Sequence, residues 1–268
     1  MSRRIGAAEI AARKGAAFPM VTAYDAPFAR CAEEAGIDVI LVGDSLGMVV
    51  LGYDSTAPVE LNDMVRHAAA VVRGTQRAHV IADLPFGTYE ASDELAVASA
   101  TELIKRGHAS SVKLEGGVNA ASRIRAIVRS GIPVCAHVGV LPQTASLGSG
   151  FRLKREREQL VRDADAVAEA GAFAVVLEMV EDALAAEITQ RSPIPTIGIG
   201  AGPSCDGQVL VLHDVLGLYP DAPPFAKQYA TLGEAATSAL RAYAEDVRAH
   251  AFPRTRVKAG HDGNGYRA

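Results

Sequence analysis

The sequence predicts an α/β protein built as a single (β/α)8 barrel. Eight short runs rich in Val, Ile and Leu recur along the chain without polar alternation, as expected for parallel strands buried on both faces. Helical patterns separate most of these runs, which indicates a parallel sheet covered by helices. The length of 268 residues fits one barrel of about 250 residues.

The eight apolar runs are the predicted strands. They lie at residues 20–23, 39–42, 80–82, 111–114, 134–136, 174–177, 196–199 and 209–212. The predicted helices lie at 27–36, 59–74, 92–107, 119–129, 156–170, 181–190 and 232–249. Gly36 and Gly74 close the first two helices at positions typical of a C-cap, and Ser92 begins the third as an N-cap.

The connection between the last two predicted strands is unusually short. About nine residues separate Ile199 from Val209, whereas a parallel crossover usually takes about a dozen residues or more. We therefore expect that the seventh helix is missing or reduced to a turn, or that the eighth strand is misplaced.

The chain is expected to form one domain. No low-complexity linker interrupts residues 1–252, which we assign to the barrel, and the polar, Gly-rich tail at 253–268 is expected to be disordered. The loop at 141–155 follows the fifth strand and contains Gly and Ser, so it is a candidate lid over the site.

The composition favours a cytoplasmic protein. The formal net charge of −4 speaks against a nucleic-acid or membrane-surface binder. The N-terminus lacks the apolar core of a signal peptide, and no segment approaches the ~18 apolar residues of a membrane span. The three cysteines are widely spaced without a CxxC motif, so neither a zinc site nor a disulfide framework is expected.

Six titratable side chains share one place in the pattern, the end of an apolar run. They are Asp44, Asp83, Lys113, Glu115, His137 and Glu178. Since the carboxyl ends of barrel strands open into the active site, these groups are expected to converge there. Four carboxylates, an imidazole and an ammonium group at one end of a barrel predict an enzyme.

Three of the carboxylates, Asp44, Asp83 and Glu115, are candidate metal ligands. Oxygen ligands without thiols suit a hard cation such as Mg²⁺, which keeps several waters and accepts substrate oxygens. The alternative is that each carboxylate caps a helix or pairs with an arginine.

The other three groups have catalytic and structural interpretations. Lys113 is either a ligand for a substrate carboxylate or half of a structural ion pair. Glu178 follows an apolar run and is a candidate proton acceptor, or a charge at the start of the next helix. His137 could polarise a carbonyl group or hydrogen-bond a carboxylate, or it could be structural. The Gly-rich run at 198–202 is not a P-loop and indicates a tight turn or a close backbone approach.

Longer motifs around these residues resemble one known family. LVGDSLGMVVLGYDST, ADLPFGTY, VKLEGG, CAHVGVLPQ, VVLEMV and IPTIGIGAGPSCDGQVLVLHDVLG are similar, in order and spacing, to motifs of the ketopantoate hydroxymethyltransferases. The resemblance runs over residues 20–252. It implies a (β/α)8 barrel of the phosphoenolpyruvate mutase/isocitrate lyase-like superfamily.

The resemblance also implies a reaction. Members transfer a hydroxymethyl group from the co-substrate 5,10-methylenetetrahydrofolate to 3-methyl-2-oxobutanoate, which gives 2-dehydropantoate for pantothenate and coenzyme A biosynthesis. The reaction passes through an enolate stabilised by Mg²⁺. Members form homo-oligomers, typically decamers in bacteria.

The same resemblance implies a role for each candidate residue. Asp44 and Asp83 would hold Mg²⁺, and Glu115 would support the ion directly or through water. Glu178 would be the proton acceptor. The residues implied to bind the oxo acid are Asp44, Ser45, Asp83, Lys113 and His137.

Two alternative functions stay open on the sequence. The first is a Mg²⁺-dependent C–C lyase or mutase of the same superfamily that acts on another 2-oxo acid, from which folate-dependent turnover would separate a transferase. The second is a barrel that serves as a binding or scaffold protein without turnover, which a lack of Mg²⁺ binding would favour.

Overall fold

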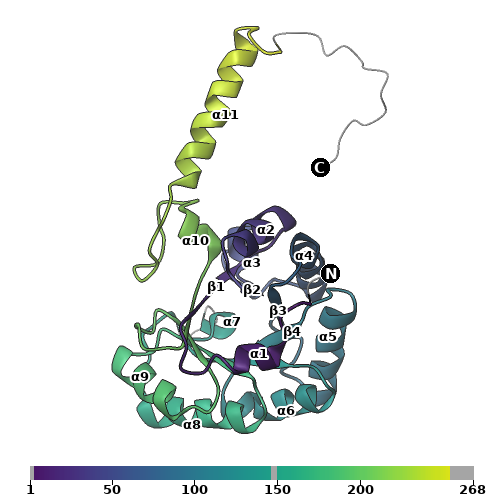
Figure 1. Ribbon diagram of the computed structural model, residues 1–268, viewed down its shortest axis with the longest axis vertical. Helices are drawn as coiled ribbons and strands as arrows, with labels where there is room; N and C mark the ends of the chain where they lie inside the picture. The colour runs from purple at the N-terminus through teal and green to yellow at the C-terminus, as the bar shows by residue number, and fades with distance from the viewer. Residues whose placement is uncertain (1–2, 146–149, 254–268) are drawn as a thin grey trace. The chain divides into compact units, whose positions relative to one another are not determined.

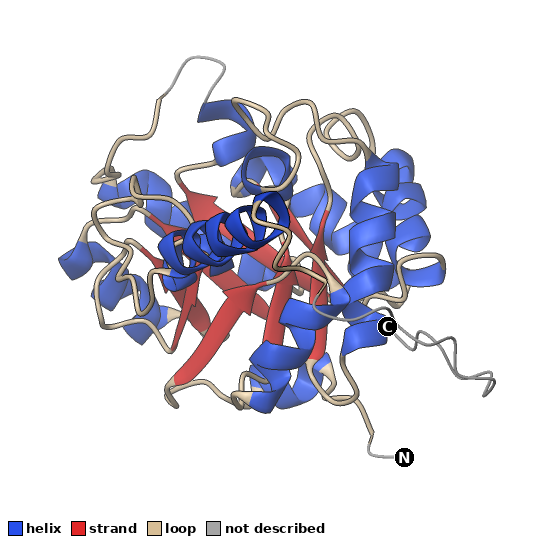
Figure 2. Cartoon of the chain, turned by 90° about the horizontal axis from the view of Figure 1, so that it is seen from above, coloured by secondary structure: helices blue, strands red, loops and turns tan. Residues whose placement is uncertain are grey.

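Eight parallel strands close into a barrel in the order β1 to β8 (Figure 2). The computed structural model describes residues 3–145 and 150–253. The strands are β1 (Phe18–Thr22), β2 (Val39–Val42), β3 (His79–Asp83), β4 (Ser111–Glu115), β5 (Val134–Gly139), β6 (Ala174–Glu178), β7 (Thr196–Ile199) and β8 (Gly207–Leu210). The predicted barrel is confirmed, and β2 and β7 have the predicted bounds.

Helices cover the outside of this barrel, with α4, α5, α6, α8 and α9 ranged around the strands (Figure 1). The helices are α1 (Ala7–Ala11), α2 (Ala26–Glu34), α3 (Leu46–Val49), α4 (Leu61–Gly74), α5 (Asp93–Lys105), the 3₁₀ helix η1 (Val118–Ala120), α6 (Ala121–Arg129), α7 (Pro142–Thr144), α8 (Arg157–Glu169), α9 (Asp182–Arg191), α10 (Leu212–Leu216) and α11 (Leu232–Arg248). The short helices α1, α3, α7 and α10 were not predicted, because three to five residues carry too little periodicity, whereas η1 lies partly within the helix predicted at 119–129.

Two of the predicted helix caps are confirmed and one is wrong. The Ser92 side chain accepts a hydrogen bond from Leu95 N, and Gly36 has the left-handed φ of 85° found after a helix end. Gly74 is the last residue of α4, and Thr75 is its C-cap. A Cβ on Gly74 would lie 2.7 Å from Ala26 Cα, so this glycine allows α2 and α4 to pack closely.

The connection between β7 and β8 is a short turn, which explains why so few residues separate the last two predicted strands. The segment 200–206, described throughout, contains no helix, so the expected loss of the seventh helix is confirmed. The eighth strand also begins two residues before the predicted 209, at Gly207. Asp206 holds this turn in place, because its Oδ2 accepts from Thr196 N at 2.8 Å and its Oδ1 accepts from Gly15 N at 2.7 Å.

The chain divides into two compact units. One comprises Met1–Leu212 with Pro223–Ala226 and contains the barrel, and the other comprises His213–Ala222 with Lys227–Ala268 and contains α11. The assignment of residues 1–252 to a single domain therefore stays a prediction. Most of the predicted tail, residues 254–268, lies outside the described residues, as do residues 146–149 of the candidate lid.

Apolar side chains pack the barrel interior and leave one end of it polar. Ile10 of α1 joins side chains from the strands in one buried cluster, which also contains Phe18, Met20, Val39, Leu41, Ile81, Cys135, Phe173, Ala174, Val176, Ile197 and Val209. The polar residues follow these apolar ones along the strands, at the carboxyl ends of β2 to β6. The apolar core therefore lies directly below the polar residues of the candidate site.

Candidate active site

The barrel brings all six predicted titratable groups to the carboxyl ends of five consecutive strands. Asp83 is paired in register with Lys113, Glu115 with His137, and Gly139 with Glu178. Asp44 follows β2 directly after Gly43, and its backbone N donates to Asp83 Oδ2 at 3.1 Å. Neighbouring strands lie about 4.8 Å apart, so these side chains form one polar cluster.

Lys113 and Asp83 form a buried ion pair across two strands. Lys113 Nζ lies 2.7 Å from Asp83 Oδ1, and the two side chains are 5% and 2% exposed. Burial alone would lower the pKa of Lys113, but the carboxylates of Asp83, Glu115 and Asp44 outweigh burial and raise it. The lysine is therefore a fixed positive charge at the centre of the acidic cluster.

His137 lies between Lys113 and two carboxylates. Its Nδ1 is 3.4 Å from Lys113 Nζ and 3.5 Å from Glu115 Oε1, and its Nε2 is 3.3 Å from Glu178 Oε2. Burial lowers the pKa of His137, and the charge of Lys113 lowers it further, so the ring is neutral at pH 7. We assign the proton to Nε2, facing Glu178, because Nδ1 faces an ammonium donor.

The carboxylates of Asp44 and Glu115 are too deeply buried to ionise freely. Burial, with a further contribution from Asp83, raises the pKa of Asp44 to about 7. Burial also raises the pKa of Glu115 well above its usual value, and although Lys113 opposes the shift, Asp44 and Asp83 add to it. Four carboxylates surround a single ammonium group here, so the cluster lacks positive charge.

This excess of buried negative charge fits a divalent cation. Within residues 3–145 and 150–253, no three His, Cys, Asp or Glu side chains are grouped closely enough to hold an ion by themselves. Mg²⁺ does not require such a group, because one or two carboxylates, several waters and substrate oxygens usually complete its coordination. Asp44 and Asp83 are the pair that could hold it, with Glu115 at the edge of the site.

The alternative structural roles of these acids, as helix caps or as partners of arginines, do not match their contacts. In the described part of the chain, none of Asp44, Asp83 and Glu115 has an arginine partner or caps a helix. Glu178 is the last residue of β6, whereas α9 begins after Glu181. The acids therefore belong to the mouth of the barrel and not to helix ends.

Gln143 is a site residue that the sequence reasoning missed. It is 1% exposed, and its Nε2 donates to Asp44 Oδ2 at 2.8 Å and to Leu84 O at 2.9 Å. Its backbone N donates to Glu115 Oε2 at 3.2 Å, and Tyr89 Oη donates to its Oε1 at 2.6 Å. The only signal in the sequence was the Pro-Gln pair in the CAHVGVLPQ motif, since nothing local indicates which strand the amide reaches.

Ser45 lies beside the cluster and contacts a different partner. Its Oγ is 2.9 Å from the Oη of Tyr24, and either hydroxyl can donate. The residue follows Asp44 directly and is the N-cap of α3. The implied contact of Ser45 with a substrate stays a prediction.

Gly139 sets the backbone next to Glu178, and its substitution by Ala is expected to destabilise the protein. Gly139 has a φ of 104°, and a Cβ there would collide with the carbonyl O of Glu178. We expect Gly139→Ala to lower the free energy of unfolding by about 2 kcal/mol or more, measured by urea unfolding. Gly131→Ala is the matched control, because Gly131 has a φ of 91° with nothing within 4 Å of an added Cβ. Equal losses in the two variants would contradict the collision.

The raised pKa of Asp44 predicts a pH-dependent stability of the metal-free protein. A carboxyl whose pKa rises from 3.8 unfolded to about 7 folded favours the native state at low pH and loses that contribution as pH rises to about 7. In EDTA, Asp44→Asn should therefore gain stability over wild type between about pH 4 and pH 8, by up to about 4 kcal/mol. Thermal melts across this range are the measurement, with the exposed Asp54→Asn as control. A pH-independent difference would contradict the shift.

The fold and the site together define a (β/α)8-barrel enzyme with a buried acidic cluster at the carboxyl ends of its strands. A family model described as ketopantoate hydroxymethyltransferase matches residues 4–255. The chain belongs to the ketopantoate hydroxymethyltransferase family.

Curated relatives support this membership over nearly the whole chain. A 3-methyl-2-oxobutanoate hydroxymethyltransferase from Ignicoccus hospitalis is 51% identical over 245 residues, which cover 90% of this chain and 93% of the relative. Proteins of the same name from Chloroflexus aurantiacus and Moorella thermoacetica are 55% and 54% identical, and the matches cover 90% of this chain and 86% and 91% of the relatives.

Solved structures share the fold at low sequence identity. A phosphoenolpyruvate phosphomutase from Streptomyces platensis subsp. rosaceus has a TM-score of 0.61 at 18% identity and covers 92% of this chain and 88% of its own. A 2,3-dimethylmalate lyase of the PEP mutase/isocitrate lyase superfamily has a TM-score of 0.60 at 20% identity, with coverages of 97% and 92%. These structures confirm the predicted barrel fold.

Proposed function

We propose that the protein transfers a hydroxymethyl group from 5,10-methylenetetrahydrofolate to 3-methyl-2-oxobutanoate and forms 2-dehydropantoate. The observation that carries this proposal is a carboxylate, Glu178, which faces a neutral His137 beside the buried Lys113–Asp83 pair. A base next to a fixed positive charge suits proton removal from carbon beside a carbonyl group. The names of the relatives support the same reaction.

Each residue of the candidate site has a separate role in the proposed reaction. Glu178 removes the C3 proton, and His137 orients the Glu178 carboxylate through Nε2. Lys113 lies where it can stabilise the negative charge that develops on the oxo acid, while Ser45 and Asp83 help to position that substrate. The dry core below excludes water from the reacting carbon.

We also propose that Asp44 and Asp83 hold Mg²⁺, with Glu115 supporting the ion directly or through water. Bound there, Mg²⁺ would polarise the carboxylate and 2-oxo oxygens of the substrate as a Lewis acid. The shortage of positive charge around Asp44 and Glu115 supports this assignment.

The reaction itself is the direct test. Purified protein with Mg²⁺, 3-methyl-2-oxobutanoate and methylenetetrahydrofolate should yield 2-dehydropantoate, followed by proton NMR. Cleavage or rearrangement of another 2-oxo acid without folate would instead favour a lyase or mutase. Absence of both turnover and Mg²⁺ binding would favour a scaffold protein.

Gln143 is expected to tune the metal site through Asp44. Gln143→Leu removes the amide that donates to Asp44 Oδ2, so the Asp44 carboxylate loses both orientation and stabilisation of its charge. We expect the affinity for Mg²⁺ to fall about 10–100-fold, measured by calorimetric titration. Tyr89→Phe removes only the hydroxyl that fixes Gln143, so its effect should be smaller. An unchanged affinity in Gln143→Leu would show that the amide plays no part in metal binding.

We propose a cytoplasmic homo-oligomer, a decamer by family resemblance. The three cysteines, Cys31, Cys135 and Cys205, are free. No helix in the described ranges is long and apolar enough to cross a membrane.

Helix α11 carries an apolar stripe that suits packing against another surface, formed at helical spacing by Leu240, Tyr243 and Val247. Light scattering on the purified protein would measure the assembly, and a monomer at micromolar concentration would contradict it.

A further inference from the structure

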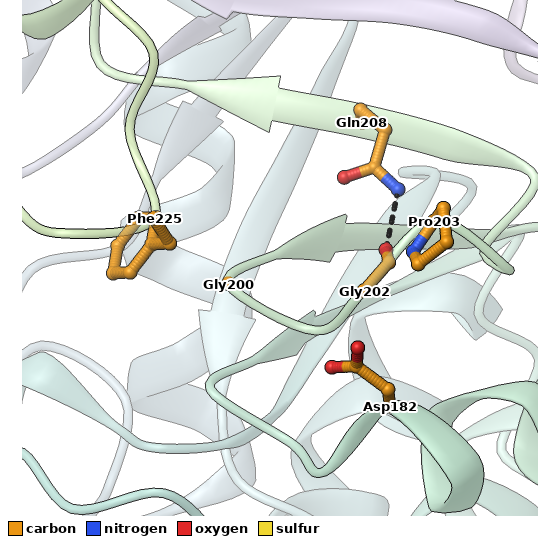
Figure 3. Close-up of a pocket in the computed structure, with 6 residues that line it drawn as sticks. All are labelled: Asp182, Gly200, Gly202, Pro203, Gln208 and Phe225. Carbon is orange, nitrogen blue, oxygen red and sulfur yellow. Dashed lines mark hydrogen bonds between the residues drawn. The ribbon is translucent and has the colours of Figure 1, made fainter.

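The recess beside the Gly-rich run lies on the outside of the barrel. Its lining consists of Asp182, Gly200, Gly202, Pro203, Gln208 and Phe225 (Figure 3). A Cβ on Gly200 would lie 2.9 Å from the ring of Phe225, which confirms the close backbone approach that the sequence indicated. Gln208 is exposed and alternates along β8 with the buried Gly207 and Val209, so it points away from the barrel interior. The recess therefore faces away from the acidic cluster in the barrel mouth.

A buried tyrosine just beyond the carboxyl end of β1 contacts the candidate site from behind. Tyr24 follows the last residue of β1 by two positions and is 3% exposed, and its Oη lies 2.9 Å from Ser45 Oγ. Its backbone is held by two neighbouring elements. Ala23 N donates to Leu41 O of β2 at 2.9 Å, and His67 Nδ1 of α4 donates to Tyr24 O at 2.6 Å. The phenol therefore projects towards Ser45 from a fixed point of the barrel.

The Ser45 hydroxyl lies on the side of the acidic cluster. A Cβ on Gly43 would lie 2.8 Å from Ser45 Oγ and 3.5 Å from Asp83 Oδ2, so the hydroxyl and this carboxylate share one side of the Gly43 backbone. Ser45 is half-buried, whereas Tyr24 behind it is buried. The serine is thus the accessible end of the hydroxyl pair, next to an acid that we propose as a Mg²⁺ ligand.

The chemistry of the two hydroxyl groups sets the direction of the hydrogen bond between them. A phenol is a stronger acid than an aliphatic alcohol, so Tyr24 is the better donor and Ser45 the better acceptor. The proton of Ser45 then stays available for an oxygen atom of a bound substrate. A hydroxyl that accepts one hydrogen bond also becomes a stronger donor, because hydrogen bonds in a chain polarise one another.

We propose that Tyr24 is a positioning residue for the oxo acid, which holds the Ser45 hydroxyl so that this hydroxyl donates to the substrate carboxylate. The inference rests on the proposed function, in which Ser45 helps to position 3-methyl-2-oxobutanoate. Tyr24 acts only through Ser45, because its own hydroxyl is buried behind the serine. Its contribution is to binding and not to proton removal, since the proposed base, Glu178, stands at the end of β6.

The test is a double-mutant cycle on the full chain with Mg²⁺, in which calorimetry measures the Kd of 3-methyl-2-oxobutanoate. Ser45→Ala removes a hydrogen bond to a charged group, so the Kd should rise about 10-fold or more. Tyr24→Phe removes only the phenol hydroxyl, so the Kd should rise about 3–10-fold. The variant with both changes should bind no more weakly than Ser45→Ala alone, because Tyr24 acts through Ser45.

A second measurement separates positioning from a general structural role. Tyr24→Phe should raise the KM for C3 exchange and leave kcat and the affinity for Mg²⁺ within about twofold of wild type, as expected for a loss of uniform binding. A disturbed barrel mouth would change kcat and Mg²⁺ binding as well. Tyr53→Phe is the matched control, because Tyr53 follows α3 and is 41% exposed, so its Kd and KM should equal those of wild type.

The outcomes separate this inference from the proposed function. If Ser45→Ala weakens binding but Tyr24→Phe does not, or if the two effects multiply in the double variant, the positioning role is overturned and the function stands. If Ser45→Ala leaves the Kd unchanged, the inference is overturned in the same way. Equal losses of Mg²⁺ and substrate binding in Tyr24→Phe would also overturn it, in favour of a structural role. If wild-type protein neither binds the oxo acid nor exchanges its C3 proton, the proposed function fails and the inference fails with it.

Discussion

Glu178→Gln is expected to slow exchange of the C3 proton of 3-methyl-2-oxobutanoate by about 10²–10⁴-fold, the usual contribution of a positioned general base. Glutamine keeps the size of the side chain but cannot accept the proton. The change should also abolish formation of 2-dehydropantoate, because no carbon nucleophile forms without that proton transfer. Proton NMR in D₂O with Mg²⁺ measures the exchange directly.

The control for this loss is a carboxylate in the same segment. Glu181→Gln alters an exposed side chain that pairs with Arg155 at 3.7 Å and is expected to exchange at the wild-type rate. Thermal melts of both variants exclude unfolding as the cause. If Glu178→Gln keeps exchange within about threefold of wild type, the base lies elsewhere, and His137, which is 3.3 Å from Glu178, is the next candidate.

Removal of divalent cations is expected to have an effect of similar size. Polarisation of a carbonyl by a bound cation is worth several kcal/mol, and each 1.36 kcal/mol is a factor of ten, so chelation should slow exchange by about 10³-fold or more. Addition of Mg²⁺ should restore the rate. The measurement is the same NMR exchange after EDTA treatment and dialysis, with residual metal determined by elemental analysis.

The Asp44→Asn variant tests whether this metal dependence arises at the acidic cluster. Asp44→Asn should show the metal-free rate even in saturating Mg²⁺, although the same change is expected to stabilise the metal-free fold at pH 8. A variant that loses activity but gains stability would show that the buried Asp44 carboxylate destabilises the metal-free fold and is needed for the reaction. Full exchange in metal-free protein would contradict the proposed role of Mg²⁺.

Sequence reasoning was most successful where a signal is local. The strands β2 and β7 have their predicted bounds because continuous apolar runs mark a strand buried on both faces. The acids Asp83 and Glu178 are each the last residue of their strand, as the charge after each apolar run indicated. The eighth strand was predicted two residues late, because Gly207 and Gln208 carry no apolar signal although they pair with β1 and β7.

The roles within the site depended on contacts that no local pattern encodes. Lys113 and Glu115 lie on one face of β4, yet the lysine forms its short ion pair with Asp83 of the neighbouring strand. Gln143 lies 99 residues from Asp44, and only the closed barrel brings the amide to that carboxylate. Gly74 was read as a helix cap because its conflict with Ala26 comes from another helix.

The amino-acid sequence was sufficient to predict the barrel class, the family resemblance and the identity of the charged groups at the strand ends, because apolar runs and motifs are properties of neighbouring residues. The tertiary structure was needed to show how those groups pair, which of them are too buried to ionise freely, and that side chains lie directly against the Gly-rich run. Pairing and burial depend on strand register and on the closure of the barrel. These bring together residues that are far apart along the chain, so their effect on charge and shape appears only in the folded molecule.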